Sequence, residues 1–251
     1  MIAIQFDRNY VHWGVLLLRS LALHEPRKRV LADTVGLSRE QAAEVAGAHP
    51  KVIHQDRPAP AGGTSRASMV NEKVWFLRQV VADYPREPWY CLFDADFLVR
   101  RPLTPLWDCM RWAEVGVVVN PAWPIHMRVW GSLVLLRKDG RVLLDRWAGE
   151  YANGPIGGFR PGEFFFDQAS LARAFEVTPV RYARIPQAEY LDHLLREDSS
   201  IWSAHVALEE KDRFYRLFLA EHERQVREAR PGSGRISVQS PVPGNLPARP
   251  A

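Results

Sequence analysis

The 251-residue sequence has only two cysteines and no apolar run as long as the roughly 18–20 residues that cross a bilayer. Two cysteines, Cys91 and Cys109, do not make a disulfide framework, so we expect a reducing, cytoplasmic setting. The opening MIAIQFD lacks the basic segment and cleavage site of a signal peptide. The net charge is only +4 and is spread along the chain, so nucleic acid is not an expected partner. A mildly basic protein of this kind could instead bind phosphorylated ligands or contact the inner face of a membrane peripherally.

Apolar runs alternate with helical patterns along most of the chain. We expect strands at residues 2–6, 29–35, 51–55, 89–96, 114–120, 131–137, 181–186 and 200–207, and helices at residues 12–24, 37–49, 71–84, 141–152, 163–175 and 211–229. Ser38 is the expected N-cap of the second helix, and Pro85 follows the third. The alternation predicts an α/β fold with a mixed, mostly parallel sheet flanked by helices. Residues 1–230 are expected to form one domain, and 231–251 a tail without its own core.

Two carboxylates interrupt an apolar segment, WYCLFDADFL, at residues 89–98. In an extended chain, residues i and i+2 point the same way, so Asp94 and Asp96 would face one point with Ala95 turned away. Such a pair repels itself unless a cation is present, and Mn²⁺ or Mg²⁺ bound by carboxylates and phosphate oxygens fits this chemistry. The alternative is a strand that ends in solvent with two acids on its turn. Because ligands bind beyond the carboxyl ends of parallel strands, Asp7 is expected in the same crevice.

The strand, the Asp-x-Asp and the apolar triplet after it resemble the metal site of nucleotide-sugar glycosyltransferases with the GT-A fold. Four further segments resemble, in order, the retaining family that includes glycogenin and bacterial lipopolysaccharide galactosyltransferases: DRNY (7–10), GLSREQAAEV (36–45), FFFDQASL (164–171) and IWSAHVALEEK (201–211). The resemblance implies a single GT-A, Rossmann-like domain. It also implies sugar transfer from a nucleoside diphosphate sugar, with UDP as the first choice and retention of configuration. The acceptor would be a carbohydrate, a lipid-linked compound or a small molecule.

The resemblance also assigns roles to individual residues. It implies that the metal ligands are Asp94, Asp96 and His205, with a neutral imidazole as the third ligand. Lys211 would contact the diphosphate as a point charge, although the first turn of a charged helix is an equally ordinary place for a lysine.

Donor contacts are implied for a second group of residues. Asp7 would read the base and Tyr10 would stack on it, unless Tyr10 is simply a core aromatic residue. Lys73 and Arg66 are competing candidates for the basic residue that such enzymes place against the donor. The remaining implied donor contacts come from Asn9 and Ala95.

Catalytic roles are implied for Gln168 and Asp167, beside the donor sugar. The Gln168 amide oxygen would steady developing positive charge, and Asp167 would hold a hydroxyl. An acid in the first turn of a helix is also favourable on dipole grounds alone.

The chain departs from the family pattern in two places. Gly131 and Leu133 stand where the family has Asn and Gly, and KDR replaces KPW after the closing His. These changes concern the sugar and the acceptor more than the metal. Two other functions therefore stay open: a sugar nucleotidyltransferase, which usually has a Gly-rich signature near the first strand that this chain lacks, and a non-catalytic protein that binds nucleotide sugars. Four tryptophans between the metal strand and the sixth strand belong to the core or stack on sugar rings: Trp107, Trp112, Trp123 and Trp130.

Overall fold

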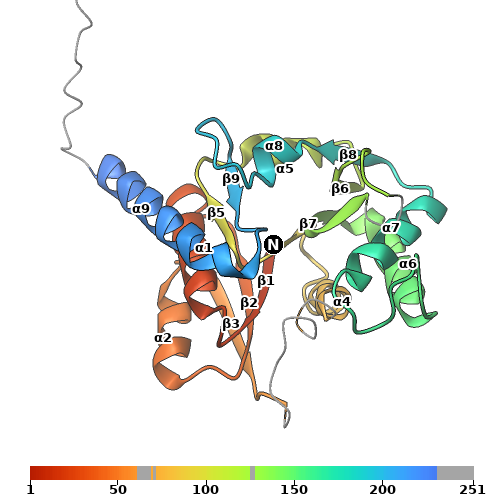
Figure 1. The fold of residues 1–251 in the computed structure, drawn as a ribbon, viewed down its shortest axis with the longest axis horizontal. Coiled ribbons are helices and arrows are strands. Elements are labelled where there is room, and N and C mark those ends of the chain that lie inside the picture. The colour runs from red at the N-terminus through yellow and green to blue at the C-terminus, as the bar shows by residue number, and fades with distance from the viewer. Residues whose placement is uncertain (61–68, 70–71, 125–127, 231–251) are drawn as a thin grey trace, which may run out of the picture.

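The sheet of the computed structural model, which describes residues 1–60, 69, 72–124 and 128–230, has seven strands in the order β3-β2-β1-β4-β7-β6-β8 (Figure 1). The strands are β1 (Ile2–Asp7), β2 (Val30–Val35), β3 (Val52–Arg57), β4 (Trp89–Phe93), β6 (Val115–Val119), β7 (Val129–Arg137) and β8 (Tyr182–Ile185). Strand β7 runs antiparallel to β4 and to β6, and the other pairs are parallel. The predicted α/β class with a mixed, mostly parallel sheet is confirmed.

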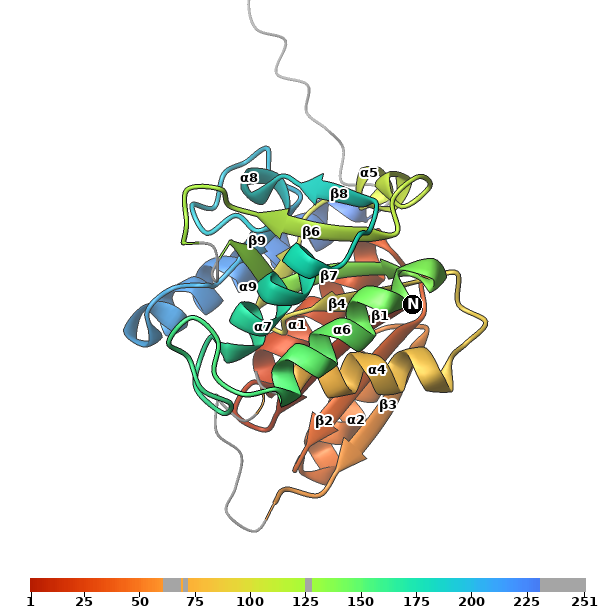
Figure 2. The same ribbon diagram turned by 90° about the vertical axis from the view of Figure 1, so that its right-hand side faces the viewer.

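Helices cover both faces of this sheet (Figures 1 and 2). One side carries α1 (Val11–His24), α2 (Arg39–Gly47) and α9 (Lys211–Ala229), and the other carries α4 (Lys73–Asp83), α6 (Arg141–Ala152) and α7 (Phe166–Val177). Shorter helices are α5 (Thr104–Cys109), α8 (Gln187–Tyr190) and the 3₁₀ turns η2 (Lys138–Gly140) and η3 (Leu208–Glu210). No helix in the described part of the chain is both long and apolar enough to cross a membrane.

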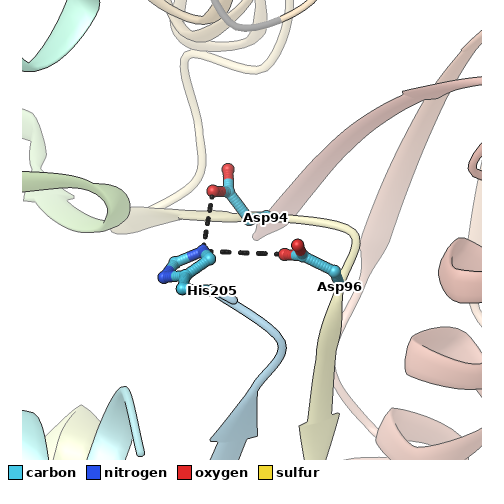
Figure 3. Close-up of side chains that lie close together, drawn as sticks. All are labelled: Asp94, Asp96 and His205. Atoms are coloured by element: carbon cyan, nitrogen blue, oxygen red, sulfur yellow. Dashed lines mark hydrogen bonds and ion pairs between the residues drawn. The ribbon is translucent and has the colours of Figure 1, made fainter. Parts of the chain in front are cut away.

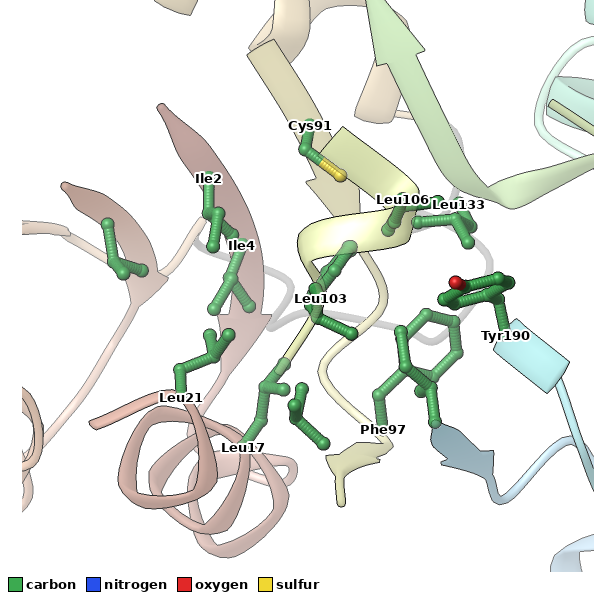
Figure 4. Packing of buried hydrophobic residues seen from close by; sticks show 14 of the residues in the cluster. Ile2, Ile4, Leu17, Leu21, Cys91, Phe97, Leu103, Leu106, Leu133 and Tyr190 are labelled. Carbon is green, nitrogen blue, oxygen red and sulfur yellow. The ribbon is translucent and has the colours of Figure 1, made fainter. Parts of the chain in front are cut away.

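The hydrophobic core lies in two main layers, one on each face of the sheet. Side chains alternate along β1, so Ile2 and Ile4 pack in the layer that contains Leu17 and Leu21 of α1, while Ala3 belongs to the layer under α4 and α6 (Figure 4). Burial on both faces explains why the central strands read as nearly continuous apolar runs. The sheet is therefore a rigid base for the groups at its strand ends.

A second, two-stranded sheet pairs β5 (Phe97–Val99) with β9 (Ile201–Ser203) in antiparallel register. Leu98 and Trp202 from these strands pack with Trp13 of α1 and Phe218 of α9 in a third cluster. This pairing brings the chain after residue 200 alongside the chain after residue 96.

Several predicted boundaries are wrong. The strand expected at 89–96 ends at Phe93, because residues 94–96 turn before β5. The strand expected at 200–207 is only β9, and the helix expected from 163 begins at Phe166. Strand β5 and helices α5 and α8 were missed because they are too short to show a period. Ser38 caps α2 with a reciprocal capping box, as predicted. The expected tail lies outside the described residues.

Candidate functional site

A cavity of about 470 Å³ opens beyond the carboxyl ends of β1 and β4. It collects most of the residues that the sequence singled out: Asp7, Asn9, Tyr10, Lys73, Asp94, Ala95, Asp96, Asp167, Gln168 and His205. Lys211 is buried and bonds to the Asp96 carboxylate at the cavity wall. Arg66 lies outside the described residues. Residues from six separate segments therefore meet at the strand ends, as expected for ligand sites in such sheets.

Asp94, Asp96 and His205 form a cluster that could hold a metal ion (Figure 3). His205 Nε2 lies 3.3 Å from Asp94 Oδ2 and 3.6 Å from Asp96 Oδ1, and the ligand atoms all lie within 4.8 Å of one another. Two carboxylate oxygens and one imidazole nitrogen suit Mn²⁺, and Mg²⁺ less well because it prefers oxygen. The donor set therefore fits the divalent ion that the sequence predicted.

Backbone hydrogen bonds, rather than an extended strand, place the two acids. The Asp94 N–H donates to the Ser132 carbonyl of β7 at 3.0 Å, and the Ala204 N–H donates to the Asp96 carbonyl at 3.0 Å. The sequence argument from alternating side chains is wrong here, because residues 94–96 form a turn. Both carboxylates still face His205, since the turn is held at one end by β7 and at the other by the chain that follows β9.

Two lysines pair with the acids. Lys73 Nζ lies 2.6 Å from Asp94 Oδ1 and 3.7 Å from Asp167 Oδ2, while Lys211 Nζ donates to Asp96 Oδ2. Burial alone would raise the pKa of Asp94, but Lys73 and then His205 outweigh burial and lower this pKa below its usual range. Burial likewise tends to lower the pKa of Lys73, yet Asp94 and Asp167 raise it. Asp94 is therefore ionised and Lys73 charged at neutral pH.

Asp167 lies in the first turn of α7 and is almost fully buried. Burial raises the pKa of this carboxyl; Lys73 opposes the increase and the neighbouring Asp94 adds to it. The absence of a side chain at Gly131 lets Asp167 approach β7, because a Cβ built there would lie 3.1 Å from Asp167 Oδ2. The departure from the family pattern at residue 131 thus makes room for a candidate catalytic group.

Asp7 shapes the turn that leads into α1. Its carboxylate accepts hydrogen bonds from the Asn9 N–H at 2.9 Å, the Asn9 Nδ2 at 3.1 Å and the Tyr10 N–H at 3.3 Å. The Lys211 ammonium lies 5.7 Å from the centre of the Tyr10 ring. Base reading by Asp7 and stacking by Tyr10 stay predictions. Asp7 has a structural role in this turn as well.

Aromatic and apolar residues form much of the remaining wall, and the sequence pattern assigned most of them no role. The cavity is also lined by Phe164, Phe165, Val206, Leu208, Trp123 and Trp130. The FFFDQ segment carries a signal for the first two, since three phenylalanines precede the candidate catalytic pair. The other two tryptophans lie elsewhere: Trp107 stacks on Trp89, and the Trp112 side chain is exposed.

No family model and no curated protein matches the chain. Solved structures are similar to it over most of its length. The apo bifunctional glycosyltransferase WbbM matches with a TM-score of 0.60 and 13% identity over 90% of this chain, which spans about half (51%) of that protein. A glycosyltransferase involved in the glycosylation of the major capsid of PBCV-1 matches at 0.57 and 13% identity over 86% of this chain and 98% of that one. The galactosyltransferase LgtC, in complex with donor and acceptor sugar analogues, matches at 0.56 and 14% identity over 88% of this chain and 96% of its own. The chain therefore has the GT-A fold of these glycosyltransferases.

Proposed function

We propose that this protein is a metal-dependent glycosyltransferase that moves a sugar from a nucleoside diphosphate sugar, with UDP as the preferred nucleotide, to the hydroxyl of an acceptor. The observation that carries the proposal is the convergence of Asp94, Asp96 and His205 in one cavity at the strand ends. Retention of configuration is part of the proposal and rests on the family resemblance alone. The acceptor belongs to the carbohydrate, lipid-linked or small-molecule classes.

In this proposal Asp94, Asp96 and His205 hold Mn²⁺ or Mg²⁺, and the bound ion supplies a Lewis acid for the departing diphosphate. Lys73 keeps the Asp94 carboxylate ionised, and both Lys73 and Lys211 add positive charge beside the cluster. Tyr10, Asn9 and Asp7 line the part of the cavity next to β1, where the nucleoside would lie.

The sugar would lie between the metal ligands and the first turn of α7. The Gln168 amide oxygen would face the positive charge that develops at the anomeric carbon, and Asp167 would orient a sugar hydroxyl. Both side chains are nearly fully buried in the cavity wall, so their positions are fixed before the substrate arrives.

A panel of UDP-, GDP- and TDP-sugars tests the function. We expect Mn²⁺-dependent hydrolysis and a raised melting temperature with one nucleotide class, and loss of both in EDTA. The Asp94→Asn variant should lose both. Asp108→Asn is the matched control, since Asp108 is half-exposed and pairs with Arg111 outside the cavity. Full turnover in EDTA would show that the metal part of the proposal is wrong.

A non-catalytic protein that binds nucleotide sugars is the second candidate. Gly131 and Leu133 replace the family's Asn and Gly, so the Asn amide that would line the sugar pocket is missing; this loss favours the non-catalytic candidate, even though Gly131 also leaves room for Asp167. It predicts nucleotide-dependent stabilisation without turnover of any donor in the same panel, so the two candidates separate in one experiment.

The proposal also assigns catalysis to residues 1–230 and places the protein in the cytoplasm. If the acceptor is lipid-linked, the protein would also contact the membrane peripherally. Arg227, the basic residue in the last turn of α9, would add about 1 kcal/mol of attraction near an acidic lipid surface. Truncation after Ala229 should leave donor turnover unchanged. Loss of turnover in that variant would contradict this division of the chain.

A further inference from the structure

His205 lies where the backbone does not fix the direction of its ring. The residue follows β9 in an irregular segment, before η3 begins at Leu208. A histidine that binds a metal usually donates its second ring N–H to a carbonyl or a carboxylate, which fixes the tautomer and the orientation of the ring. Here His205 Nδ1 is buried, and it has no hydrogen-bond partner in the part of the chain that the structure describes. The ring is therefore held by something other than the usual hydrogen bond.

Aromatic contacts take that place. The Trp130 indole is stacked on the His205 ring, with ring centres 5.5 Å apart and planes 12° from parallel. Phe97 of β5 contacts the imidazole at a centroid distance of 5.5 Å and an angle of 60°. Trp123 packs on Trp130 at 4.8 Å, so the indole is itself supported. The imidazole thus has a parallel ring and a tilted ring as neighbours, while its Nε2 faces the two acids.

Strand β7 connects this contact to the rest of the cluster. Trp130 and Ser132 are two residues apart on β7, so their side chains point to the same face, and both line the cavity. The Ser132 carbonyl also receives the backbone N–H of Asp94. One short piece of β7 therefore sets the backbone of one candidate ligand and the ring plane of another.

Trp130 is a poor choice for a residue that only fills space. Its indole Nε1 is buried and has no hydrogen-bond partner among the described residues, although a buried indole N–H usually finds one. A phenylalanine or leucine would fill the wall without that unpaired donor.

We propose that Trp130 is a positioning residue for metal binding: its ring holds the His205 imidazole by stacking, so that Nε2 faces Asp94 and Asp96. The proposal rests on the metal site of the proposed function. Because loss of an outer contact to a metal ligand typically costs 10–100-fold in metal affinity, removal of the ring should weaken Mn²⁺ binding by at least about tenfold.

The test measures free Mn²⁺ by electron paramagnetic resonance during titration of the full chain, without any sugar donor. Trp130→Phe keeps a flat ring and should bind Mn²⁺ within about threefold of the unsubstituted protein, whereas Trp130→Leu keeps an apolar side chain without a ring and should bind at least about tenfold more weakly. Melting temperatures are recorded in parallel, so that only folded variants are compared. Trp107→Ala is the matched control: Trp107 also stacks nearly parallel on a ring, Trp89, at 4.6 Å and 14°, but does not line the cavity.

The outcomes separate the two proposals. If Trp130→Leu and Trp130→Phe bind Mn²⁺ equally well, stacking does not position His205 and this inference is wrong, while the proposed function stands. If Trp107→Ala weakens binding as much as Trp130→Leu, the effect is general destabilisation and the inference is again wrong. If the unsubstituted protein binds no Mn²⁺, the metal site of the proposed function fails first.

Discussion

Lys73, the first residue of α4, places its ammonium 2.6 Å from the carboxylate of Asp94, the first acid after β4. The same ammonium lies 3.7 Å from Asp167. One lysine thus joins a candidate metal ligand to a candidate catalytic residue, whereas Asp96 pairs with a different lysine, Lys211. Neutralising Asp94 therefore leaves Lys73 with Asp167 as a second partner, whereas neutralising Asp96 removes the carboxylate to which Lys211 bonds.

We expect Asp96→Asn to destabilise the fold more than Asp94→Asn. Loss of the Asp96 charge leaves the Lys211 ammonium buried near Tyr10 and Trp13, which should lower the free energy of unfolding by about 3 kcal/mol. Lys73 keeps Asp167 as a partner in Asp94→Asn, so that loss should be about 1 kcal/mol. Urea denaturation at neutral pH measures both values.

A double variant checks the cause of this difference. Asp96→Asn with Lys211→Met should recover most of the lost stability, because no unpaired charge remains, while Mn²⁺ binding stays lost. Equal stability losses in the two single variants would contradict the assignment of Lys211 to Asp96.

Gly131→Ala should reduce catalysis without weakening ligand binding. The added Cβ would lie 3.1 Å from Asp167 Oδ2, so the carboxylate has to shift. A small displacement of a catalytic group is costly, and we expect donor turnover to fall by about tenfold or more. Mn²⁺ and UDP affinities, measured by calorimetry, should stay unchanged.

Gly149→Ala is the control for this variant, since a Cβ at Gly149 of α6 meets no atom within 4 Å. It should retain full turnover and should be slightly more stable, because alanine is the better helix former. Unchanged turnover in Gly131→Ala would contradict the prediction that catalysis depends on the exact position of the Asp167 carboxylate.

Tyr10→Ala should weaken UDP binding by about fivefold in the absence of acceptor, because a stacked aromatic ring is worth about 1 kcal/mol beyond the area it buries. Tyr10→Phe keeps the ring and should bind normally. Isothermal titration calorimetry with UDP and Mn²⁺ distinguishes the two variants. Equal UDP affinities in all three proteins would mean that Tyr10 only packs against its neighbours.

The acid sensitivity of the fold should depend on Glu221 of α9. Burial tends to raise its pKa, but hydrogen bonds from Arg224, Arg100 and Gln225 outweigh burial and lower it from 4.5 to about 2. Because the folded-state pKa is lowered, the carboxylate stabilises the fold fully above about pH 4.5, and this contribution is lost as the pH falls toward 2.

Glu221→Gln should therefore be less stable than the unsubstituted protein above about pH 5, and the difference should shrink as the pH falls to about 3. Urea denaturation across this range measures it. Glu228→Gln is the control, since the Glu228 side chain is mostly exposed and pairs with Arg224 at the surface. A difference that stays constant with pH would contradict the role of Glu221.

Much of the architecture follows from the sequence because it depends on local patterns. The buried central strands read as apolar runs, and amphipathic segments between them form the covering helices, so the sheet and the meeting of Asp7 with Asp94 at its strand ends could be predicted. The resemblance to glycosyltransferases added His205 and Lys211, which no local pattern connects to the acids.

The pairing within the site could not be predicted, because it depends on contacts between distant segments. The resemblance suggested that Lys211 contacts the diphosphate and that Lys73 or Arg66 lies against the donor, but not that each lysine bonds to one of the acids. The turn at residues 94–96 could not be predicted either, because the strand after it, β5, is too short to show a pattern. The strand that pairs with β5, β9, lies about a hundred residues further along the chain.

The pairing of β5 with β9 determines when, during folding, the cluster of Asp94, Asp96 and His205 can form. Asp94 and His205 are 111 residues apart, so the chain between them has to be closed into a loop before the third ligand can join the acids. Closure of so long a loop is slow compared with formation of the neighbouring parallel strands β1 and β2. During synthesis, the first half of the sheet can assemble while the cluster is still incomplete. In the proposed function, the site for a divalent ion would be complete only when β9 has paired with β5, so ion binding would come late in folding rather than at its start.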